Sequence, residues 1–317
     1  MVCSGERGAA LLSVLLLVAV MATVAATALD RIGVATRLAG NAATLAQARL
    51  WLQMTEQLAA VRIEDMLAAD QSRTTIAGGW LGTEQQVALP DGGMVRARLD
   101  DGSNCFNLNS LAEDRNGRLV PRPAGARQFV NLMVLLGLPQ AEAGRIAERA
   151  TSFLIGIGPS GPVADEAGEA AGRLIVDRSE LRAVDGVSAA HHARLKPWLC
   201  ALPTTDLAPI NVNTLQPEQA PLIAMLDPDH IDLHRARAQL ASRPSAGYRS
   251  VYEFWNALAF EGLGVSSEAS RQVRVRSTFL TLRARVSVGG VDHAQVVHLD
   301  ARETPVRVIA RRFGEEG

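Results

Sequence analysis

One stretch near the N-terminus limits the fold more than any other part of the sequence. Residues 9–29 (AALLSVLLLVAVMATVAATAL) contain no charged side chain, and Asp30, Arg31 and Arg37 follow them. A helix rises about 1.5 Å per residue, so this run covers roughly the ~30 Å hydrocarbon layer of a membrane. The sequence therefore predicts one membrane-spanning helix at the N-terminus.

The helix is expected to continue beyond the membrane, because residues 44–69 lack proline and are rich in Ala, Leu, Gln and Arg. Apolar residues recur there with helical spacing, at Leu45, Leu52, Leu58 or Ala59, and Ile63. This stripe is expected to face partner subunits. Gly33 and Gly40 each weaken the helix by roughly 1 kcal/mol relative to Ala, so a bend is expected between them.

Two predicted hairpins frame the rest of the chain. Residues 85–89 and 94–99 alternate around a Pro-Asp-Gly-Gly turn, and residues 273–288 and 291–299 alternate around Gly289-Gly290. Residues 305–313 are expected to add an edge strand, with arginines that protect it from edge pairing. Between the hairpins, residues 123–270 have helical patterns broken by Pro and Gly. The predicted fold class is α+β, with a long N-terminal transmembrane helix, a small antiparallel sheet and a large all-helical insertion.

Charge and cysteine content argue against several function classes. The 32 basic and 33 acidic residues give a net charge of −1, so no overall positive field attracts nucleic acid or anionic lipid. Three cysteines, Cys3, Cys105 and Cys200, are too few for a disulfide-built fold and lack the C-x-x-C spacing of zinc or redox sites. The core must therefore come from apolar burial.

Two local patterns point to chemistry, but each has a simpler structural interpretation. Gly156, Gly158 and Gly161 spell the G-x-G-x-x-G dinucleotide fingerprint, yet a proline interrupts it and no crossover helix follows. His230 and His234 have a metal-ligand spacing but no Glu after the first histidine, so a solvated helix face explains them, as it does the pair at 191–192. No nucleophile motif is present, and no enzyme activity is expected.

Two processing patterns fit the leader MVCSGERG. An ordinary signal peptide would be cut after the triplet at 26–28, leaving Leu29 first, but the apolar run exceeds the usual ~7 to 15 residues. A charged leader that ends in Gly8 directly before an apolar helix resembles the prepilin peptidase site of type IV pilins and type II secretion pseudopilins. The resemblance implies cleavage after Gly8, methylation of Ala9, and a helix held in the inner membrane until assembly.

Ser13 narrows this resemblance. Most members of the family carry Glu at the fifth mature position, which is Ser13 here. A carboxylate inside a bilayer costs a few kcal/mol unless it is paired, and in the family it is taken to pair with the N-terminal amine of the neighbouring subunit. The K-type minor pseudopilin, placed at the filament tip, characteristically lacks this Glu. Ser13 therefore points to the K type.

Further motifs are similar to the K-type minor pseudopilins in order and spacing. They are the stretches 100–111 (DDGSNCFNLNSL), 179–187 (SELRAVDGV), 195–199 (LKPWL) and 210–214 (INVNT). The family's acidic, calcium-associated loop is replaced by SFLIGIG at 152–158, and only Asp165 and Glu166 remain nearby as weak calcium candidates. Calcium prefers six to eight oxygen ligands, so no cofactor is expected.

A second resemblance gives an alternative function. Residues 211–226, 236–243 and 248–254 resemble the helix-hairpin-helix repeats of membrane-anchored DNA-uptake receptors. Those repeats meet phosphate through the backbone N–H groups of a Gly-x-Gly turn. Here the turn is Leu226-Asp227-Pro228-Asp229, whose two acids repel phosphate and whose proline lacks an N–H. No nucleic-acid partner is expected.

The K-type resemblance implies a structural subunit of the type II secretion pseudopilus, used for protein export across the outer membrane. Its expected partners are the I-type and J-type minor pseudopilins, prepilin peptidase and the inner membrane, with the C-terminal domain in the periplasm. Loss of Cys3 with the leader would leave Cys105 and Cys200 in an oxidising compartment, where they either pair, tying the insertion down, or stay as buried thiols.

The expected organisation has six parts in chain order. They are a leader at 1–8, the transmembrane segment at 9–29, its periplasmic continuation at 30–70, the first part of the sheet domain at 78–110, the helical insertion at 111–270, and the C-terminal strands at 271–317.

Overall fold

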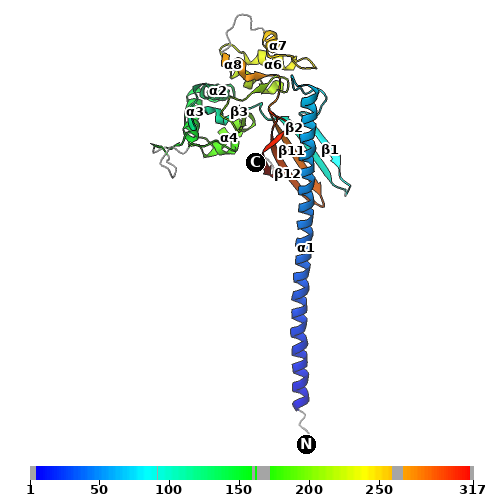
Figure 1. Cartoon of the computed structure of the whole chain (residues 1–317). Helices are drawn as coiled ribbons and strands as arrows, with labels where there is room; N and C mark the ends of the chain where they lie inside the picture. Colours follow the sequence, from blue (N-terminus) through cyan, green and yellow to red (C-terminus); the bar gives the residue numbers. More distant parts are fainter. Residues whose placement is uncertain (1–4, 91, 159–160, 163–171, 259–266, 315–317) are drawn as a thin grey trace.

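A 65-residue helix, α1 (Gly5–Ala69), dominates the computed structural model, which describes residues 5–90, 92–158, 161–162, 172–258 and 267–314. The N-terminal half of α1 stands clear of the head, whereas its C-terminal part lies along the sheet (Figure 1). The helix is unbroken at Gly33 and Gly40, where a bend was expected. The helix formers around the two glycines outweigh their small penalty.

Five antiparallel strands form the sheet against which α1 packs. In spatial order they are β1 (Glu84–Ala88), β2 (Met94–Asp101), β11 (Phe279–Val288), β12 (Val291–Asp300) and β13 (Arg307–Phe313). Both predicted hairpins are confirmed, with β1 paired to β2 and β11 paired to β12. The two hairpins meet because β11 also pairs with β2, opposing Leu280 to Asp101. The chain thus leaves the sheet after Asp101 and returns to it at Phe279, close to the same point, and residues 102–278 form an insertion between the two strands.

The residues between β2 and β11 form a second lobe beside the upper end of the sheet (Figure 1). Its buried core is continuous and includes Phe106, which stacks on Phe129 with ring centroids 4.8 Å apart. The α-helices of this lobe are α2 (Pro123–Leu135), α3 (Gln140–Leu154), α4 (Ala189–Leu195), α5 (Pro221–Ala224), α6 (Leu233–Ala241), α7 (Val251–Ala257) and α8 (Ser267–Gln272). The 3₁₀ turns are η1 (Leu108–Leu111), η2 (Arg178–Ala183), η3 (Lys196–Trp198) and η4 (Pro217–Gln219).

The expectation of an all-helical insertion needs correction, because short strand pairs also occur in it. They are β3 (Phe106–Asn107) with β8 (Leu199–Cys200), β4 (Ala112–Arg115) with β5 (Arg118–Pro121), β6 (Ile157–Gly158) with β7 (Gly161–Pro162), and β9 (Ile210–Asn211) with β10 (Val273–Arg274). The β4–β5 hairpin turns at Asn116 and Gly117, whose φ angles are 57° and 82°. An Asn-Gly turn with two positive φ values is a strong hairpin signal.

The strand predicted at 273–288 begins later in the structure, at Phe279. Val273 and Arg274 pair with Ile210 and Asn211 in a parallel ladder, and β11 begins only at Phe279. A ladder of two residues is too short to produce a periodic pattern, so the alternation at 273–278 could not show that the chain changes partner there.

Candidate functional site

The part of α1 that lies on the sheet carries two apolar stripes. The first contains Ala48, Leu52, Ile63 and Leu67, each at most 5% exposed, and packs on the inner face of the sheet. The second contains Leu50, Met54, Leu58 and Val61, each between 53% and 61% exposed. At 100° per residue, the members of the second stripe lie within about 80° of arc on the opposite side of the helix.

This arrangement corrects the predicted partner-facing stripe. Leu52 and Ile63 are buried against the chain's own sheet, and of the four predicted positions only Leu58 faces away from it. Because both stripes have helical spacing, the sequence could not separate the stripe that the sheet covers from the one that it leaves exposed. We call Leu50, Met54, Leu58 and Val61 the outer stripe.

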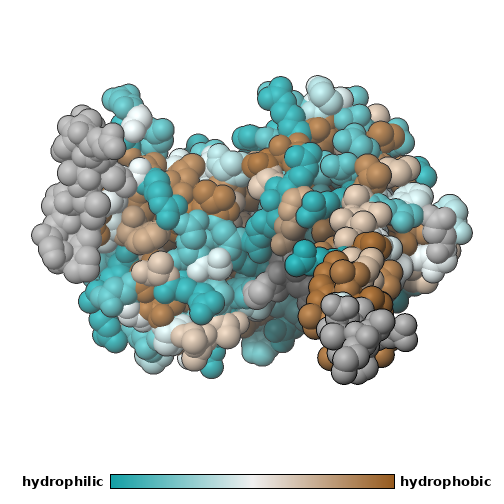
Figure 2. Space-filling view, turned by 90° about the horizontal axis from the view of Figure 1, so that it is seen from below, coloured by the Kyte–Doolittle hydropathy of each residue, from teal (hydrophilic) through white to brown (hydrophobic). Residues whose placement is uncertain are grey.

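Below the sheet, α1 exposes apolar side chains on all sides. The helix is long and apolar enough to cross a membrane, and none of its most apolar window is buried within the chain. Seen end-on, it forms a hydrophobic column beside a mostly polar head (Figure 2). Gly8 and Ala9 lie in the first turns of α1, and Ser13 follows on the exposed part of the helix. Cleavage after Gly8 stays a prediction.

A buried carboxylate fixes the position of α1 along the sheet. Glu56 is 2% exposed and accepts two hydrogen bonds from Arg311 of β13, at 2.6 and 2.8 Å, and one from Gln295 of β12 at 2.9 Å. The hydrogen bond to Glu56 raises the pKa of the Arg311 guanidinium. Because an unpaired buried charge is strongly destabilising, this contact opposes any sliding of the helix.

Buried asparagines join distant segments at the base of the insertion. The Asn104 side chain accepts from the Asn211 amide at 2.9 Å, and Asn107 donates to the carbonyls of Thr204 and Asp206 at 2.8 and 2.9 Å. Asn109 donates to the carbonyls of two distant segments at 2.8 Å each. The asparagines of the stretches 100–111 and 210–214 are therefore structural, since each satisfies backbone groups far away in the chain.

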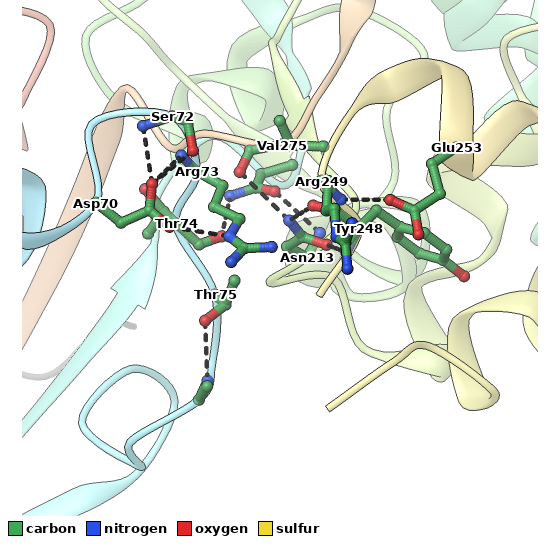
Figure 3. A network of polar contacts seen from close by, with 12 residues as sticks. Asp70, Ser72, Arg73, Thr74, Thr75, Asn213, Tyr248, Arg249, Glu253 and Val275 are labelled. Carbon is green, nitrogen blue, oxygen red and sulfur yellow. Dashed lines mark hydrogen bonds and ion pairs between the residues drawn. The ribbon is translucent and has the colours of Figure 1, made fainter. Parts of the chain in front are cut away.

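The segment that directly follows α1, residues 70–75, enters the same junction (Figure 3). Asn211 donates to the Thr74 carbonyl at 3.1 Å, and Asn213 exchanges hydrogen bonds with the backbone of Tyr248 at 2.7 and 2.9 Å. Asp70 closes the helix end, and the hydrogen bond from the Ser72 hydroxyl leads the interactions that lower its pKa to about 2. Helix, sheet and insertion thus meet in one polar network.

Asp101, the last residue of β2, places a buried carboxyl group in this junction. Its carboxylate accepts from the Ser103 amide at 3.0 Å and from the hydroxyls of Ser277 and Thr214. Burial raises the pKa of Asp101, and the hydrogen bonds only partly oppose that effect.

Cys105 and Cys200 form a disulfide in the structure, with Cα atoms 5.8 Å apart. The bond joins two segments 95 residues apart in sequence, next to the paired strands β3 and β8. It lies at the point where the chain leaves the sheet for the insertion.

The remaining candidates do not form a site in the part of the chain that the structure describes. No group of three or more His, Cys, Asp or Glu side chains in that part could hold a metal ion. Asp165 and Glu166 lie outside the described residues, so calcium binding stays untested. His230 contacts Asp227 at 2.8 Å and His191 accepts a capping hydrogen bond from Ser188, which are structural roles.

Comparison with known proteins identifies relatives along almost the whole chain. Family models described as type II secretion system (T2SS), protein K, match residues 104–204 and 210–276. The type II secretion system protein K of Dickeya chrysanthemi is 30% identical, over 98% of this chain and 97% of its own length. That of Pectobacterium carotovorum subsp. carotovorum is also 30% identical, with the same coverage.

A solved structure is similar to this fold. It is the GspK-GspI-GspJ complex of the type 2 secretion system from enterotoxigenic Escherichia coli, in which one chain matches with a TM-score of 0.70 and 27% identity. The match covers 85% of this chain and 96% of that chain. It therefore includes most of the head as well as part of α1.

Proposed function

The chain belongs to the protein K family of the type II secretion system and is a minor pseudopilin, and on that premise we propose that it caps the pseudopilus tip. We further infer that its outer stripe binds the helices of the I-type and J-type minor pseudopilins, and that α1 anchors it in the inner membrane with its head in the periplasm. Prepilin peptidase would cleave after Gly8. Each step has its own support and its own test.

The outer stripe carries the proposal. A surface helix of a single-chain domain usually hides its apolar face against its own core, and here one face is hidden while a second remains exposed along Leu50 to Val61. Apolar stripes at helical spacing are what another helix packs against. The similar solved structure is a complex of K, I and J components, which supplies candidates for those helices.

Two further features favour the tip. The second lobe sits at the end of the head away from the N-terminus of α1 (Figure 1), where it would collide with a subunit stacked above. Ser13 has no carboxylate to pair with the amine of a neighbouring subunit. Only a subunit with nothing above it can combine these two features.

A matched pair of variants tests the outer stripe. Met54→Glu places a charge in the stripe, whereas Gln53→Glu places the same charge on the adjacent exposed residue, about 100° around the helix. Burying a Met side chain contributes about 1.5–3 kcal/mol, so Met54→Glu should weaken binding of the I and J heads at least tenfold. Gln53→Glu should change it less than twofold. Equal effects of the two variants would show that the stripe is not the interface.

Stoichiometry and copy number test the tip. The full chain in detergent, mixed with I-type and J-type subunits, should give a 1:1:1 species by light scattering. Immunogold labelling should find it at one end of the filament. Labelling at many positions along the shaft would contradict capping.

N-terminal sequencing of the membrane-extracted protein tests processing. A methylated Ala9 is expected if prepilin peptidase cleaves the chain. Leu29 would instead show an ordinary signal peptide, and Met1 an uncleaved anchor.

A further inference from the structure

The face of the sheet opposite α1, the far face, carries four arginines. Apolar residues of β2 and β11, such as Leu282, pack toward α1, and the positions that alternate with them point to the far face. There Arg98 lies directly opposite Arg283, and Arg96 lies directly opposite Arg285. Like charges directly opposite each other on neighbouring strands are destabilising, so this arginine cluster needs acidic groups close by.

Two acids of the described chain lie close to one pair of the arginine cluster. The Asp100 carboxylate accepts hydrogen bonds from Arg98 at 2.8 Å and from Arg283 at 2.6 Å. Glu84 of β1 lies opposite Arg98 as well. Arg96 is four residues from Asp100 along β2, which corresponds to about 13 Å in a strand. The row of Arg98 is thus compensated more directly than the row of Arg96.

The arginine cluster lines a hollow on the far face. The hollow has a volume of about 350 Å³, and its lining also includes Ala294 of β12 and Gly314, which directly follows β13. Glu84 is the only acid among the described residues that line it. Asp292, further along β12, accepts a hydrogen bond from the Ser287 hydroxyl. The lining of the hollow is therefore positively charged.

Gly314 places the end of β13 at this hollow. Its amide donates to the Ala294 carbonyl at 2.8 Å, Ala294 pairs with Arg285, and Arg285 pairs with Arg96. These residues form one row across the sheet, in which neighbouring strands are about 4.8 Å apart, so Gly314 lies roughly 10 Å from Arg285. The φ angle of Gly314 is 100°, which glycine adopts without strain, and a turn out of the line of β13 is therefore accessible there.

The next two residues of the chain, Glu315 and Glu316, lie outside the described residues. Two extended residues span about 7 Å, and the side chains of glutamate and arginine add to that reach. Both carboxylates can therefore meet Arg285, and the path across the far face is clear, because Ala294 has a small side chain and Gly314 has none. A segment of this chain thus carries the charge that complements the arginine cluster.

The arginines of β13 itself have other partners. Arg311 binds Glu56 on the inner face, and Arg312 forms an ion pair with Asp177 of the insertion. The sequence predicted that they protect the strand edge, whereas in the structure they attach β13 to α1 and to the insertion. β13 lies at the edge of the sheet, beside β12, so a contact that holds its end also supports the attachment of α1.

We propose that Glu315 and Glu316 bind the arginine cluster and clasp the end of β13 to the far face of the sheet. Hydrogen bonds between guanidinium and carboxylate groups are among the strongest in proteins, because both partners are charged. The two carboxylates neutralise the row of Arg96 and Arg285, which lies next to Gly314. The contact is on the opposite side of the sheet from α1, so it does not depend on the outer stripe.

Carbodiimide cross-linking tests the contact in the full chain in detergent micelles. The reagent joins a lysine amine to a carboxylate that touches it, and Lys196 is the only lysine of the chain. In the Arg285→Lys variant, peptide mapping should find the introduced lysine joined to Glu315 or Glu316. Arg237→Lys, at an exposed position of α6, is the matched control and should give at least tenfold less of that product.

Three results would overturn the proposal. The introduced lysine could be joined only to Glu84, Asp100 or Asp292, which would leave the described acids as the partners of the row. A product that joins two copies of the chain would assign the carboxylates to a second molecule. Equal yields from Arg285→Lys and its control would show that the acidic segment has no preferred contact.

Neutralising the acidic segment measures the clasp without altering an arginine. Glu315→Gln with Glu316→Gln should speed hydrogen exchange of the Gly314 amide at least threefold, because the end of β13 then opens more often. Glu148→Gln with Asp229→Asn removes the same number of charges from exposed positions of the insertion and should change that rate less than 1.5-fold. An unchanged rate in the first double variant would contradict the clasp.

Discussion

The sheet is held to its two neighbours by different chemistry. Against α1 it uses an apolar stripe interrupted by one buried ion-paired carboxylate, Glu56. Against the insertion it uses polar contacts of Asp101 with Ser103, Thr214 and Ser277, next to a disulfide and buried asparagines that brace the base of the insertion. Apolar packing is strong and tolerant of shape, whereas a buried polar group must find a partner of fixed geometry. The apolar interface therefore holds the helix on the sheet, and the polar junction fixes the orientation of the second lobe.

The largest expected effect is loss of apolar packing between helix and sheet. Ile63→Ala should lower the free energy of unfolding by about 4 kcal/mol, because it leaves a cavity at a fully buried site. Val61→Ala, two residues away on the outer stripe, should change it by less than about 0.5 kcal/mol. Urea unfolding of the full chain in detergent measures both. A similar cost at the two positions would mean that the stripes are not distinct.

Loss of the covalent tie should have the next largest effect. Replacing both Cys105 and Cys200 by Ser should cost about 3 kcal/mol, because the disulfide closes a long loop in the unfolded chain. Cys3→Ser is the matched control and should cost nothing measurable. Thiol labelling of the denatured, unreduced protein after leader removal should find no free thiol. Two labelled thiols would show that the bridge does not form in the cell.

The free energy of unfolding should be sensitive to the loss of a single asparagine side chain from the polar junction. Asn211→Ala should cost about 2 kcal/mol, because it leaves the Thr74 carbonyl and the Ser277 hydroxyl without their donor. Asn256→Ala, at an exposed position of α7, should stay within about 0.5 kcal/mol. If Asn211→Ala proved as mild as its control, the junction would not depend on these hydrogen bonds.

A smaller effect on stability depends on pH and arises at the junction between sheet and insertion, where Asp101 is buried. Burial raises the pKa of Asp101 above its unfolded value, so the folded state holds this proton more tightly than the unfolded state. That contribution to stability is complete below the unfolded pKa, near 4, and is lost as the pH rises through the folded pKa.

Asp101→Asn removes the titration and should keep the hydroxyl partners. Its stability relative to the unaltered chain should therefore increase as the pH rises from about 4 towards neutrality. Paired urea titrations across that range provide the measurement. A constant difference at every pH would contradict the assignment to Asp101.

The smallest expected effect concerns calcium. We expect that millimolar calcium and its removal by chelator shift the unfolding temperature by less than about 1 °C, because a ligand that does not bind the folded state cannot stabilise it. Asp165→Asn with Glu166→Gln is the control. A calcium-dependent stabilisation that this double variant abolishes would establish a metal site there.

The sequence was sufficient for the helix, both hairpins and the position of the insertion. These features have periodic patterns, such as the alternation at 85–99 and the apolar spacing of Leu52 and Ile63, and periodicity follows directly from backbone geometry. The outer stripe has the same spacing as the buried one, so burial could be assigned only after the sheet was placed.

The polar contacts could not be predicted in the same way. Asn104 and Asn211 are 107 residues apart, and Glu56 and Arg311 are 255 apart. No local spacing links such pairs, and each asparagine alone is compatible with a turn or a cap. The Asn-Gly turn of β4–β5 is different, because its signal is local and stands in the sequence at residues 116–117.

The chain path through the sheet has a mechanical consequence. The Gly102 amide donates to the Phe279 carbonyl at 2.9 Å, so the two ends of the second lobe are joined where it leaves and re-enters the sheet. A pull along α1 passes through Glu56 to β12 and β13 and then across the ladders of the sheet. The second lobe joins this path at its root, because Asn211 holds the Thr74 carbonyl just beyond α1 and Arg312 of β13 is paired with Asp177, so a force along the helix also reaches the lobe there.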